Sequence, residues 1–246
     1  MTIIFFLMNI PFFYAADLNN GEHLYSLDEV SVRHCLQVLR KKEGDMIMLT
    51  NGRGKLFRCM IEKAEKKNCL VSIQEIEEVP AKPVQSGIGI AFTKNISRIE
   101  WFLEKATEIG ITDIYPLITQ RTERIKFNFT RLQNIIVAAV LQSEQAWLPQ
   151  LHEQISFEKL IEEKGYDLKF IAHCENEEKH FFADETDTNK NTLILIGPEG
   201  DFTPEEISLS KEYQFIPVSL GTNRLRTETA GLAACVMMNE IKRLKA

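Results

Sequence analysis

Residues 193–202 read LILIGPEGDF, and this stretch decides the fold class. Its four leading apolar residues predict a buried β-strand, which the Gly-Pro-Glu-Gly turn then ends. Thr203, Pro204 and Glu206 follow as a capping box with proline at the first helical position, so a helix is expected to begin there. A buried strand that leads straight into a capped helix is typical of an α/β domain.

The same alternation extends over the chain from residue 87 onward. Apolar runs predict strands at Ile88–Phe92, Ile114–Ile118, Leu168–Ala172, Leu193–Ile196 and Phe215–Leu220. Apolar residues at helical spacing predict helices at Thr130–Trp147 and Thr229–Leu244, and a capping box at Ser97–Glu100 predicts another helix that ends at Gly110. Strands and helices that alternate in this way indicate a parallel sheet covered by helices.

Residues 8–79 carry a different pattern, made of short strands separated by turns. Strands are expected at Ile10–Tyr14, Asp45–Leu49, Leu56–Ile61 and Leu70–Ile76, with one helix at Leu27–Leu39. Repeated short strands in such a short segment predict a small β-barrel. Two prolines in Val79–Pro83 stop both helix and strand, so we expect two domains, 1–79 and 80–246.

Composition places the chain among ordinary globular proteins. Of its 246 residues, 44% are apolar and 26% are charged, which excludes collagen-like, mucin-like and wholly disordered chains. The net charge of −6 is unevenly distributed, because residues 33–58 hold seven bases against two acids whereas residues 158–187 hold ten acids against four lysines. The basic region either binds a polyanion or is a solvated surface, and charge alone does not separate the two interpretations.

Cysteine usage and the amino terminus indicate a cytosolic protein. The five cysteines have no zinc or redox spacing, so we expect them to be reduced and mostly buried, Cys174 included. Residues 1–16 are apolar and uncharged, but no base precedes them, Pro11 interrupts them, and the run is too short to span a membrane. Met8 is a candidate for the true start, with Met1–Leu7 as an extension.

Familiar metal and nucleotide motifs are not found in the sequence. The five histidines have no metal-ligand spacing, so no metal is expected. Gly87–Gly89 begins a dinucleotide fingerprint but lacks its third glycine, and Gly52–Lys55 lacks two positions of a phosphate-binding loop.

Two loops concentrate the polar and glycine residues of the second domain. The first is the turn within residues 193–202, and the second is LGTNRLRTETA at 220–230, which also follows a strand and enters a helix. Arg224, Arg226 and Glu228 crowd this second loop, where they could bind phosphate or a base edge, or simply begin a helix. Because α/β proteins bind ligands at the carboxyl ends of their strands, the two loops are the candidate site; an ordinary strand-to-helix turn is the alternative.

These loops resemble the IGPEGG and LG-x-RILRTETA signatures of the RsmE family of 16S rRNA uridine-N3 methyltransferases, which belongs to the SPOUT class. His34–Arg40 is similar to the family's H-x-x-x-V-L-R, and Lys94–Pro116 is similar to its K-x-x-R-x-E…KATELGV…P block; Arg121 and Gln142-Ser143 fit later positions. The resemblance covers nearly the whole chain. It departs from the family at Leu141, Gln145, Asp201 and Asn223, where glutamate, arginine, glycine and arginine are usual.

The resemblance implies a fold and an activity. The fold would be α/β, with a SPOUT-type parallel sheet and a C-terminal trefoil knot, preceded by a PUA-like RNA-binding β-barrel. The protein would be a cytoplasmic homodimer that uses S-adenosyl-L-methionine, without a metal, to methylate N3 of one uridine in 16S rRNA of the assembled small ribosomal subunit.

Site residues follow from the matched motifs and from the chemistry. The cofactor slot is expected to be formed by Ile196, Gly197, Gly200, Leu220, Gly221 and Leu225, with His173 completing its wall. Methylation requires loss of the uracil N3 proton, so Arg226 is expected to stabilise the developing charge and Glu228 to serve as the base. The RNA-binding residues are expected to be Arg33, His34, Arg40, Lys42, Arg53, Lys55, Lys94 and Arg121.

Three other functions remain open from the sequence. The departures at Leu141, Gln145 and Asn223 motivate a ribosome- or RNA-binding module without catalysis. A SPOUT methyltransferase with another RNA target, such as tRNA, is a second alternative. A small-molecule α/β enzyme is a third, although the missing nucleotide and metal motifs leave it little support.

Overall fold

The computed structural model describes residues 10–123, 126–187 and 189–245, and the chain divides into two compact units. The first contains residues up to 81 together with 140–148, and the second contains 82–139 and 149–246. The short segment 140–148 therefore returns to the first unit from the middle of the second, a feature that the single boundary expected near residue 80 does not include. The expectations for residues 1–9 lie outside the described residues.

The first unit is built on one five-stranded sheet. Its order is β1 (Phe12–Tyr14), β3 (Met46–Thr50), β4 (Lys55–Glu65), β5 (Asn68–Glu78) and β2 (Leu24–Ser26), and its helical segment comprises α1 (Glu29–Arg33) and a π-helical turn η1 (His34–Val38). β3, β4 and β5 form an antiparallel meander, whereas β1 pairs in parallel with β3. The expected strands and helix are present. Strand β2 was not expected, because its three residues alternate too briefly to give a signal.

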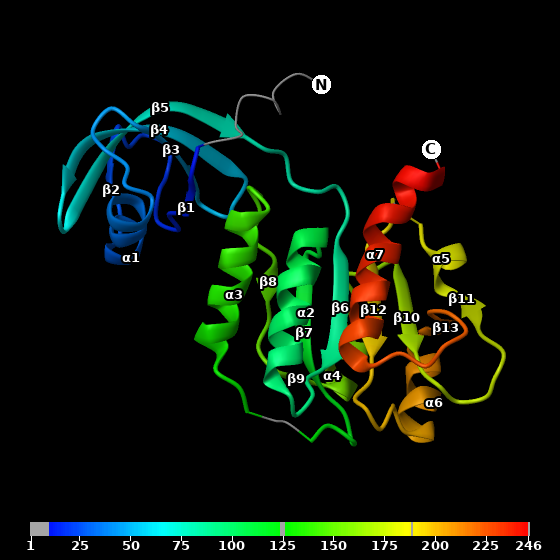
Figure 1. The fold of residues 1–246 in the computed structure, drawn as a ribbon. Coiled ribbons are helices and arrows are strands. Elements are labelled where there is room, and N and C mark those ends of the chain that lie inside the picture. Colours follow the sequence, from blue (N-terminus) through cyan, green and yellow to red (C-terminus); the bar gives the residue numbers. More distant parts are fainter. Residues whose placement is uncertain (1–9, 124–125, 188, 246) are drawn as a thin grey trace. The chain divides into compact units, whose positions relative to one another are not determined.

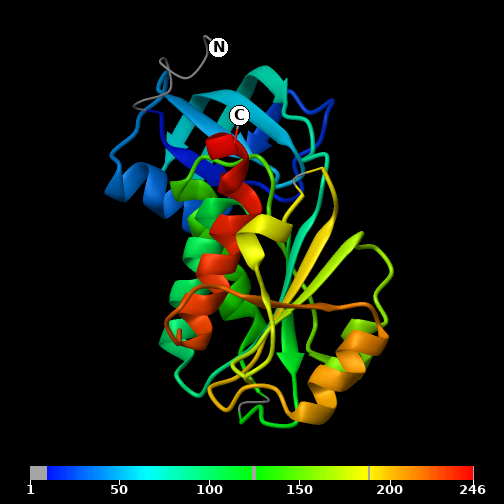
Figure 2. The ribbon, with the colours of Figure 1, turned by 90° about the vertical axis from the view of Figure 1, so that its right-hand side faces the viewer.

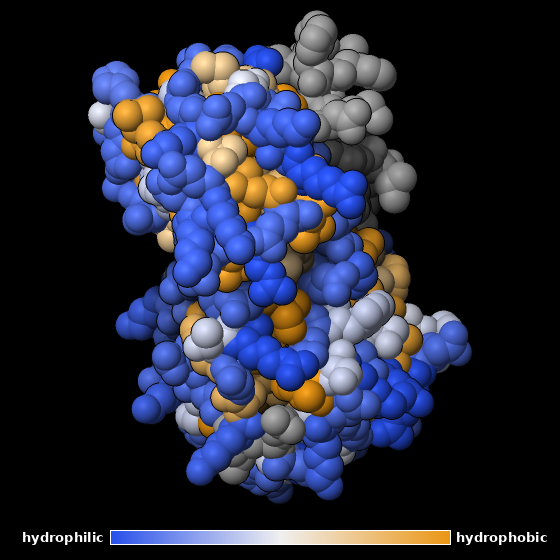
Figure 3. All heavy atoms as spheres, turned by 60° about the vertical axis from the view of Figure 1, so that its left-hand side comes forward, coloured by the Kyte–Doolittle hydropathy of each residue, from blue (hydrophilic) through white to orange (hydrophobic). Residues whose placement is uncertain are grey.

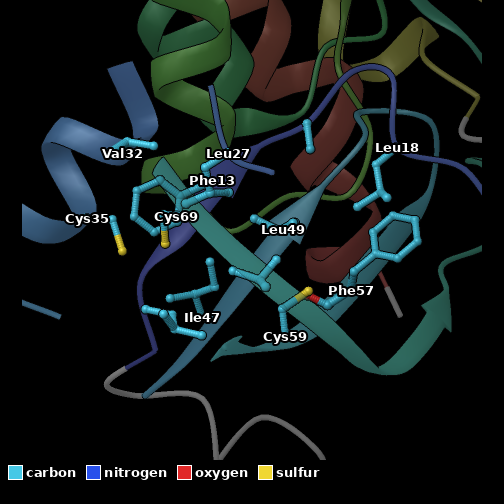
Figure 4. Packing of buried hydrophobic residues seen from close by; sticks show 13 residues of the cluster. Phe13, Leu18, Leu27, Val32, Cys35, Ile47, Leu49, Phe57, Cys59 and Cys69 are labelled. Carbon is cyan, nitrogen blue, oxygen red and sulfur yellow. The ribbon is translucent and has the colours of Figure 1, made fainter. Parts of the chain in front are cut away.

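Buried apolar side chains fill the space between this sheet and the helical segment. Figure 4 shows Phe13, Leu49 and Phe57 among them, together with the sulfur atoms of Cys35 and Cys69. All five cysteines are free, as expected, and four are buried and act as small apolar groups. Cys174 was expected in the core and is instead exposed, because it follows a strand end in the second unit.

The turn between β3 and β4 closes on the returning segment 140–148. The Gly54 amide donates to the Ala146 carbonyl at 2.9 Å, and the Trp147 indole nitrogen donates to the Val79 carbonyl at 3.0 Å. Gly54 has a φ of 86°, and a Cβ added to it would lie 2.4 Å from Cζ2 of Trp147. Only glycine combines this backbone conformation with so close an indole ring.

Gly54→Ala is expected to destabilise the protein by about 3 kcal/mol. The left-handed conformation contributes about 1–2 kcal/mol of this loss and the collision with Trp147 contributes the rest. Urea unfolding followed by tryptophan fluorescence would measure the change. Gly44→Ala is the matched control, since Gly44 has a φ of 87° and its added Cβ would meet no heavy atom within 4 Å in the described ranges, chain neighbours aside. If the two variants lost equal stability, close packing of Trp147 would have no role.

The second unit is an α/β domain around an eight-stranded, all-parallel sheet. Seven strands lie in the order β11 (His180–Phe181), β13 (Ile216–Ser219), β10 (Leu168–Ala172), β12 (Thr192–Ile196), β6 (Ser86–Ala91), β7 (Asp113–Ile118) and β8 (Gln150–Leu151), and β9 (Ile155–Ser156) also pairs with β7. The helices are α2 (Ile96–Ile109), α3 (Phe129–Gln142), α4 (Phe157–Ile161), α5 (Phe182–Glu185), α6 (Pro204–Glu212) and α7 (Thr227–Lys245).

Helices cover both faces of this sheet. Figures 1 and 2 show α2 and α7 packed together on one face, with α4 and α6 on the other. The glycine pair in β6, which fails as a nucleotide motif, permits this packing. A Cβ on Gly87 would lie 2.4 Å from the Tyr166 hydroxyl, and one on Gly89 would lie 2.5 Å from a Leu160 methyl group. The pair therefore gives room for side chains that cover the sheet.

The expected strands of the second unit are confirmed. The expected ends of its helices are confirmed at some positions and wrong at others. The Thr203 capping box is present, and Gly110 ends α2 in the left-handed conformation. The capping box expected at Ser97 is wrong, because Asn95 is the N-cap and accepts from the Ser97 amide. The helix expected through Trp147 ends at Gln142, since the following residues turn back to the first unit. The short elements β8, β9, β11, α4 and α5 were not expected.

None of the helices in the described ranges is long and apolar enough to cross a membrane. Figure 3 shows hydrophilic side chains over most of one face. The trefoil knot stays a prediction.

Candidate active site

Three neighbouring strands of the second unit end at one cavity. β13, β10 and β12 are adjacent and parallel, so the loops that leave their carboxyl ends meet at the same edge of the sheet. The cavity there has a volume of about 790 Å³. Its lining comes from residues 172–174, from residues 196–199 with Asp201, from residues 218–227, and from Lys179 and Ala230.

This cavity collects seven of the nine residues that the sequence assigned to cofactor binding or catalysis. They are His173, Ile196, Gly197, Leu220, Gly221, Leu225 and Arg226. Side chains more than 20 residues apart thus come together because parallel strands align their carboxyl ends. The geometry agrees with the grouping, although each residue's role stays a prediction.

Gly200 and Glu228 are not among the residues that line the cavity. Gly200 lies in an adjoining hollow, where its carbonyl accepts a hydrogen bond from Arg121 at 2.6 Å. Glu228 is buried at the start of α7, and its carboxylate lies 3.5 Å from Nε of Arg98 in a separate hollow beside Trp101. The structure therefore does not bring the expected base together with Arg226 in one cavity.

A hydrogen bond joins the two motif loops where both line the cavity. The Thr227 hydroxyl, which is buried, donates to the Gly197 carbonyl at 3.0 Å. The Arg226 carbonyl accepts from the Ala230 amide at 2.7 Å as helix α7 begins, while the Arg226 side chain is exposed to the cavity. The first turn of α7 therefore fixes the backbone of Arg226, from which the guanidinium extends.

Gly221 shapes the second motif loop where it leaves β13. Its φ is 141°, a conformation that side-chain-bearing residues rarely adopt, and its amide and carbonyl contact the Ser219 hydroxyl at 3.3 and 2.9 Å. The hydroxyl donates to the Gly221 carbonyl and accepts from its amide. These contacts set the course of the chain as it leaves β13 along the cavity.

Asp201, where the resembled signature has glycine, joins two walls of the cavity. Its carboxylate accepts hydrogen bonds from the Cys174 amide at 2.6 Å and from the Phe202 amide at 2.8 Å. Its φ is 63°, a left-handed conformation that aspartate tolerates better than most residues. Aspartate at this position thus adopts a backbone conformation that suits glycine, and its carboxylate adds a link to the loop after β10.

His173 is the buried titratable group of the cavity. Burial lowers the pKa of its imidazole, and the positive charge of Lys179 acts in the same direction, whereas Glu177 and Asp201 oppose it. Lys179 donates to the carbonyl oxygens of His173 at 2.8 Å and Glu175 at 2.7 Å. Sequence reasoning missed Lys179 and Asp201, and only the departure at Asp201 offered a signal for either.

The basic residues expected to bind RNA in the first unit lie in two groups. Arg33, His34, Arg40 and Lys42 are exposed on and just after the helical segment. Arg53 and Lys55 flank the β3–β4 turn, where Arg53 donates to the Asn19 side chain at 3.2 Å and Lys55 lies 3.5 Å from Glu78. Among the described residues, no carboxylate lies within 4 Å of the Arg33, Arg40 or Lys42 charges.

The two basic residues expected to bind RNA in the second unit have protein partners. Lys94 forms an ion pair of 2.5 Å with Glu123. Arg121 donates to the carbonyl oxygens of Gly200 and Phe202, at 2.6 and 3.2 Å, and so holds the loop that follows β12. No cluster of three or more potential metal ligands occurs in the part of the chain that the structure describes.

Comparison with known proteins gives concordant matches. One family model, described as an RNA methyltransferase domain, matches residues 80–239, and another, described as an RNA methyltransferase PUA domain, matches residues 27–74. A Rickettsia conorii protein named ribosomal RNA small subunit methyltransferase E is 30% identical over 82% of this chain and 84% of its own length.

Two solved structures share the fold over both units. A probable rRNA-methyltransferase from Porphyromonas gingivalis is 36% identical, with a TM-score of 0.89 over 96% of this chain and 100% of that one. A ribosomal RNA small subunit methyltransferase E from Neisseria gonorrhoeae, bound to S-adenosyl methionine, is 26% identical, with a TM-score of 0.83 over 94% of this chain and 97% of that one.

Proposed function

Because this chain belongs to the RNA methyltransferase family that includes ribosomal RNA small subunit methyltransferase E, we propose that it transfers a methyl group from S-adenosyl-L-methionine to N3 of a uridine in 16S rRNA. The substrate would be the assembled small ribosomal subunit, which places the reaction in the cytoplasm, and the active form would be a homodimer. The observation that carries the proposal is the cavity that gathers His173, Gly197, Gly221 and Arg226 at three strand ends.

The cavity fits S-adenosyl-L-methionine in size and chemistry. Its volume of about 790 Å³ lies within the range of about 300–1,000 Å³ that is usual for small-molecule sites. Ile196, Leu220 and Leu225 offer apolar contacts for the adenine, and the loop backbone at Gly197 and Gly221 offers polar groups. When bound, the cofactor supplies an electrophilic methyl group; the protein must orient the acceptor towards it.

Arg226 is the residue proposed to assist the chemistry. Loss of the uracil N3 proton places negative charge on the ring oxygens, and a fixed guanidinium can stabilise that charge through paired N–H donors. Arg226 lines the cavity and its backbone is anchored at the start of α7. Glu228 is not proposed as the base, because it is buried against Arg98 in a different hollow.

The first unit is proposed to hold RNA through exposed basic side chains on and just after its helical segment. Within the described part of the chain, no carboxylate lies within 4 Å of the charged groups of Arg33, Arg40 or Lys42, so these groups can neutralise phosphates. The same segment exposes apolar side chains, with Val30 78% and Val38 65% accessible.

The proposed reaction is tested by offering small subunits that lack the modification, and naked 16S rRNA, to the purified protein with methyl-labelled S-adenosylmethionine. Nuclease digestion followed by chromatography identifies the labelled nucleoside. We expect label in 3-methyluridine, mainly from subunits. RNA binding without any label would support the non-catalytic alternative, and label confined to tRNA would support the other RNA target.

Replacing Arg40 and Lys42 together by alanine is expected to reduce the salt dependence of subunit binding. Each lost phosphate contact lowers the slope of log K against log salt by about 1. Filter binding over a salt series measures the slope. Lys66 and Lys67 are exposed lysines of the same unit, so the Lys66→Ala/Lys67→Ala variant is the control and should keep the wild-type slope. Equal slopes in both double variants would exclude this segment from the RNA contact.

A further inference from the structure

Arg224 brings to the cavity a positive charge that no acidic side chain compensates. It lies in the second motif loop, is exposed, and lines the cavity. In the part of the chain that the structure describes, no carboxylate lies within 4 Å of its guanidinium. The resembled signature has arginine at position 223 and an apolar residue at 224, whereas this chain has Asn223 and Arg224. The charge has thus moved by one position and still lies at the cavity.

The charge of Arg224 acts on residues of another loop of the same cavity. Burial raises the pKa of the Cys174 thiol and the charge of Asp201 acts in the same direction, whereas the positive charge of Arg224 lowers it. Such effects are strong only over a few ångströms. Cys174 follows β10 and lines the cavity, whereas Arg224 belongs to the loop after β13. The guanidinium therefore lies on the side of its loop that faces other cavity residues.

The protein itself occupies two other charged groups of the cavity lining. Lys179 donates to two backbone carbonyl oxygens, at 2.8 and 2.7 Å. The Asp201 carboxylate accepts from two backbone amides, at 2.6 and 2.8 Å. Arg226 is proposed to act on the uracil. Among the cations in the described lining, Arg224 is the one that remains for an anionic group of the donor.

The donor has one anionic group, the carboxylate of its methionine part. Ile196, Leu220 and Leu225 suit the adenine but offer nothing to a carboxylate. A carboxylate that leaves water loses free energy unless charged or strong hydrogen-bond donors replace its hydration. A guanidinium does so with two parallel N–H groups, which match the two carboxylate oxygens.

We propose that Arg224 binds the carboxylate of S-adenosylmethionine and so determines the specificity of the cavity for a donor that carries this group. The inference rests on the proposed function. It gives the two arginines of the second motif loop different roles, with Arg224 directed to the donor and Arg226 to the acceptor.

Titration calorimetry with S-adenosylmethionine and decarboxylated S-adenosylmethionine, which lacks only the carboxylate, tests the contact without methyl transfer. Wild type is expected to bind the decarboxylated compound about tenfold more weakly, and Arg224→Ala should bind S-adenosylmethionine about tenfold more weakly than wild type does. Because both changes remove the same contact, Arg224→Ala should bind the two compounds within about twofold of each other. Arg226→Ala removes a like charge from the same loop, so it is the matched control and should keep the wild-type preference.

Alkylation of Cys174, the one exposed cysteine of the five, tests where the Arg224 charge lies. Iodoacetate is anionic and iodoacetamide is neutral, so the ratio of their rates with one thiol measures the local positive charge independently of the thiol pKa. Arg224→Ala is expected to lower this ratio about threefold. Arg33→Ala, which removes an exposed arginine of the first unit, should leave it unchanged. Mass spectrometry of peptides assigns the label to Cys174.

The outcomes separate the two claims. If wild type binds neither compound, the proposed function fails and the inference fails with it. If wild type binds both compounds equally, or if Arg224→Ala keeps the wild-type affinity for S-adenosylmethionine, the inference alone is overturned. Weaker binding of small subunits by Arg224→Ala, with unchanged donor affinity, would assign Arg224 to an RNA phosphate and would also overturn it. An unchanged alkylation ratio in Arg224→Ala would overturn the position of the guanidinium on which the inference depends.

Discussion

Arg226→Ala is expected to lower kcat for methylation of small subunits by about 100- to 1,000-fold. A preorganised donor aimed at a developing negative charge typically contributes this much, because the charge exists in the transition state and not in the bound substrate. The Kd for S-adenosylmethionine should change by less than about threefold. Arg226 is exposed, and its anchoring hydrogen bond uses a backbone carbonyl, so the fold should survive the substitution.

Single-turnover methylation with saturating donor, alongside calorimetry of the donor, separates these two effects. Arg226→Lys retains a charge but not the planar fork of donors, so it should recover only part of the rate. Lys190→Ala is a control for a surface charge, since Lys190 is exposed and lies 3.9 Å from Asp187. If Arg226→Ala kept the wild-type kcat, Arg226 would not stabilise the negative charge that develops on the uracil.

Gly221→Val is expected to weaken S-adenosylmethionine binding by about 100-fold, and Gly221→Ala by about tenfold. Apart from its chain neighbours, no heavy atom of the described residues lies within 4 Å of a Cβ added at Gly221, so the effect comes from its φ of 141° and not from a collision. Relieving a strain of about 1–3 kcal/mol requires the backbone to turn. That turn moves Leu220 and Thr222, which line the cavity on either side.

Gly21→Ala and Gly21→Val provide the matched controls for this prediction. Gly21 has a φ of 108° and is likewise open around its Cβ, but it lies in the first unit. Its variants should lose some stability while keeping the donor Kd of wild type. Thermal unfolding of all four variants, measured beside calorimetry, distinguishes a local change at the cavity from a general loss of folded protein.

Local signals in the sequence sufficed for most elements of the fold. The apolar run before Gly197 and the capping box at Thr203 fixed a strand and a helix that the structure contains. The end of α3 could not be found in this way. Residues 143–147 contain no glycine or proline that would end a helix, and they leave it where Ala146 bonds to Gly54 and Trp147 bonds to Val79. Contacts between residues almost one hundred positions apart do not affect the local hydrophobic periodicity from which helices are predicted.

The candidate site was predictable to the extent that it follows strand ends. His173, Gly197 and Gly221 stand directly after strands or within two residues of them, and all three line the cavity. Gly200 does not, because the loop turns between it and Gly197 and presents Gly200 to Arg121 instead. The approach of Arg224 to Cys174 joins the loops after β13 and β10, so only the folded chain brings the two side chains together.

The return of residues 140–148 to the first unit bears on how the nascent chain folds. Ala146 packs with Met48 and Leu56, and Trp147 covers the turn at Gly54, so this unit lacks part of its apolar cover when residue 81 has just been translated. Residues 82–145 must emerge before the cover arrives, and closing that long loop slows the final step. The amino-terminal unit is therefore made first but completed only when synthesis of its neighbour is well advanced, and a chain truncated after residue 81 would expose the apolar surface that Ala146 and Trp147 bury.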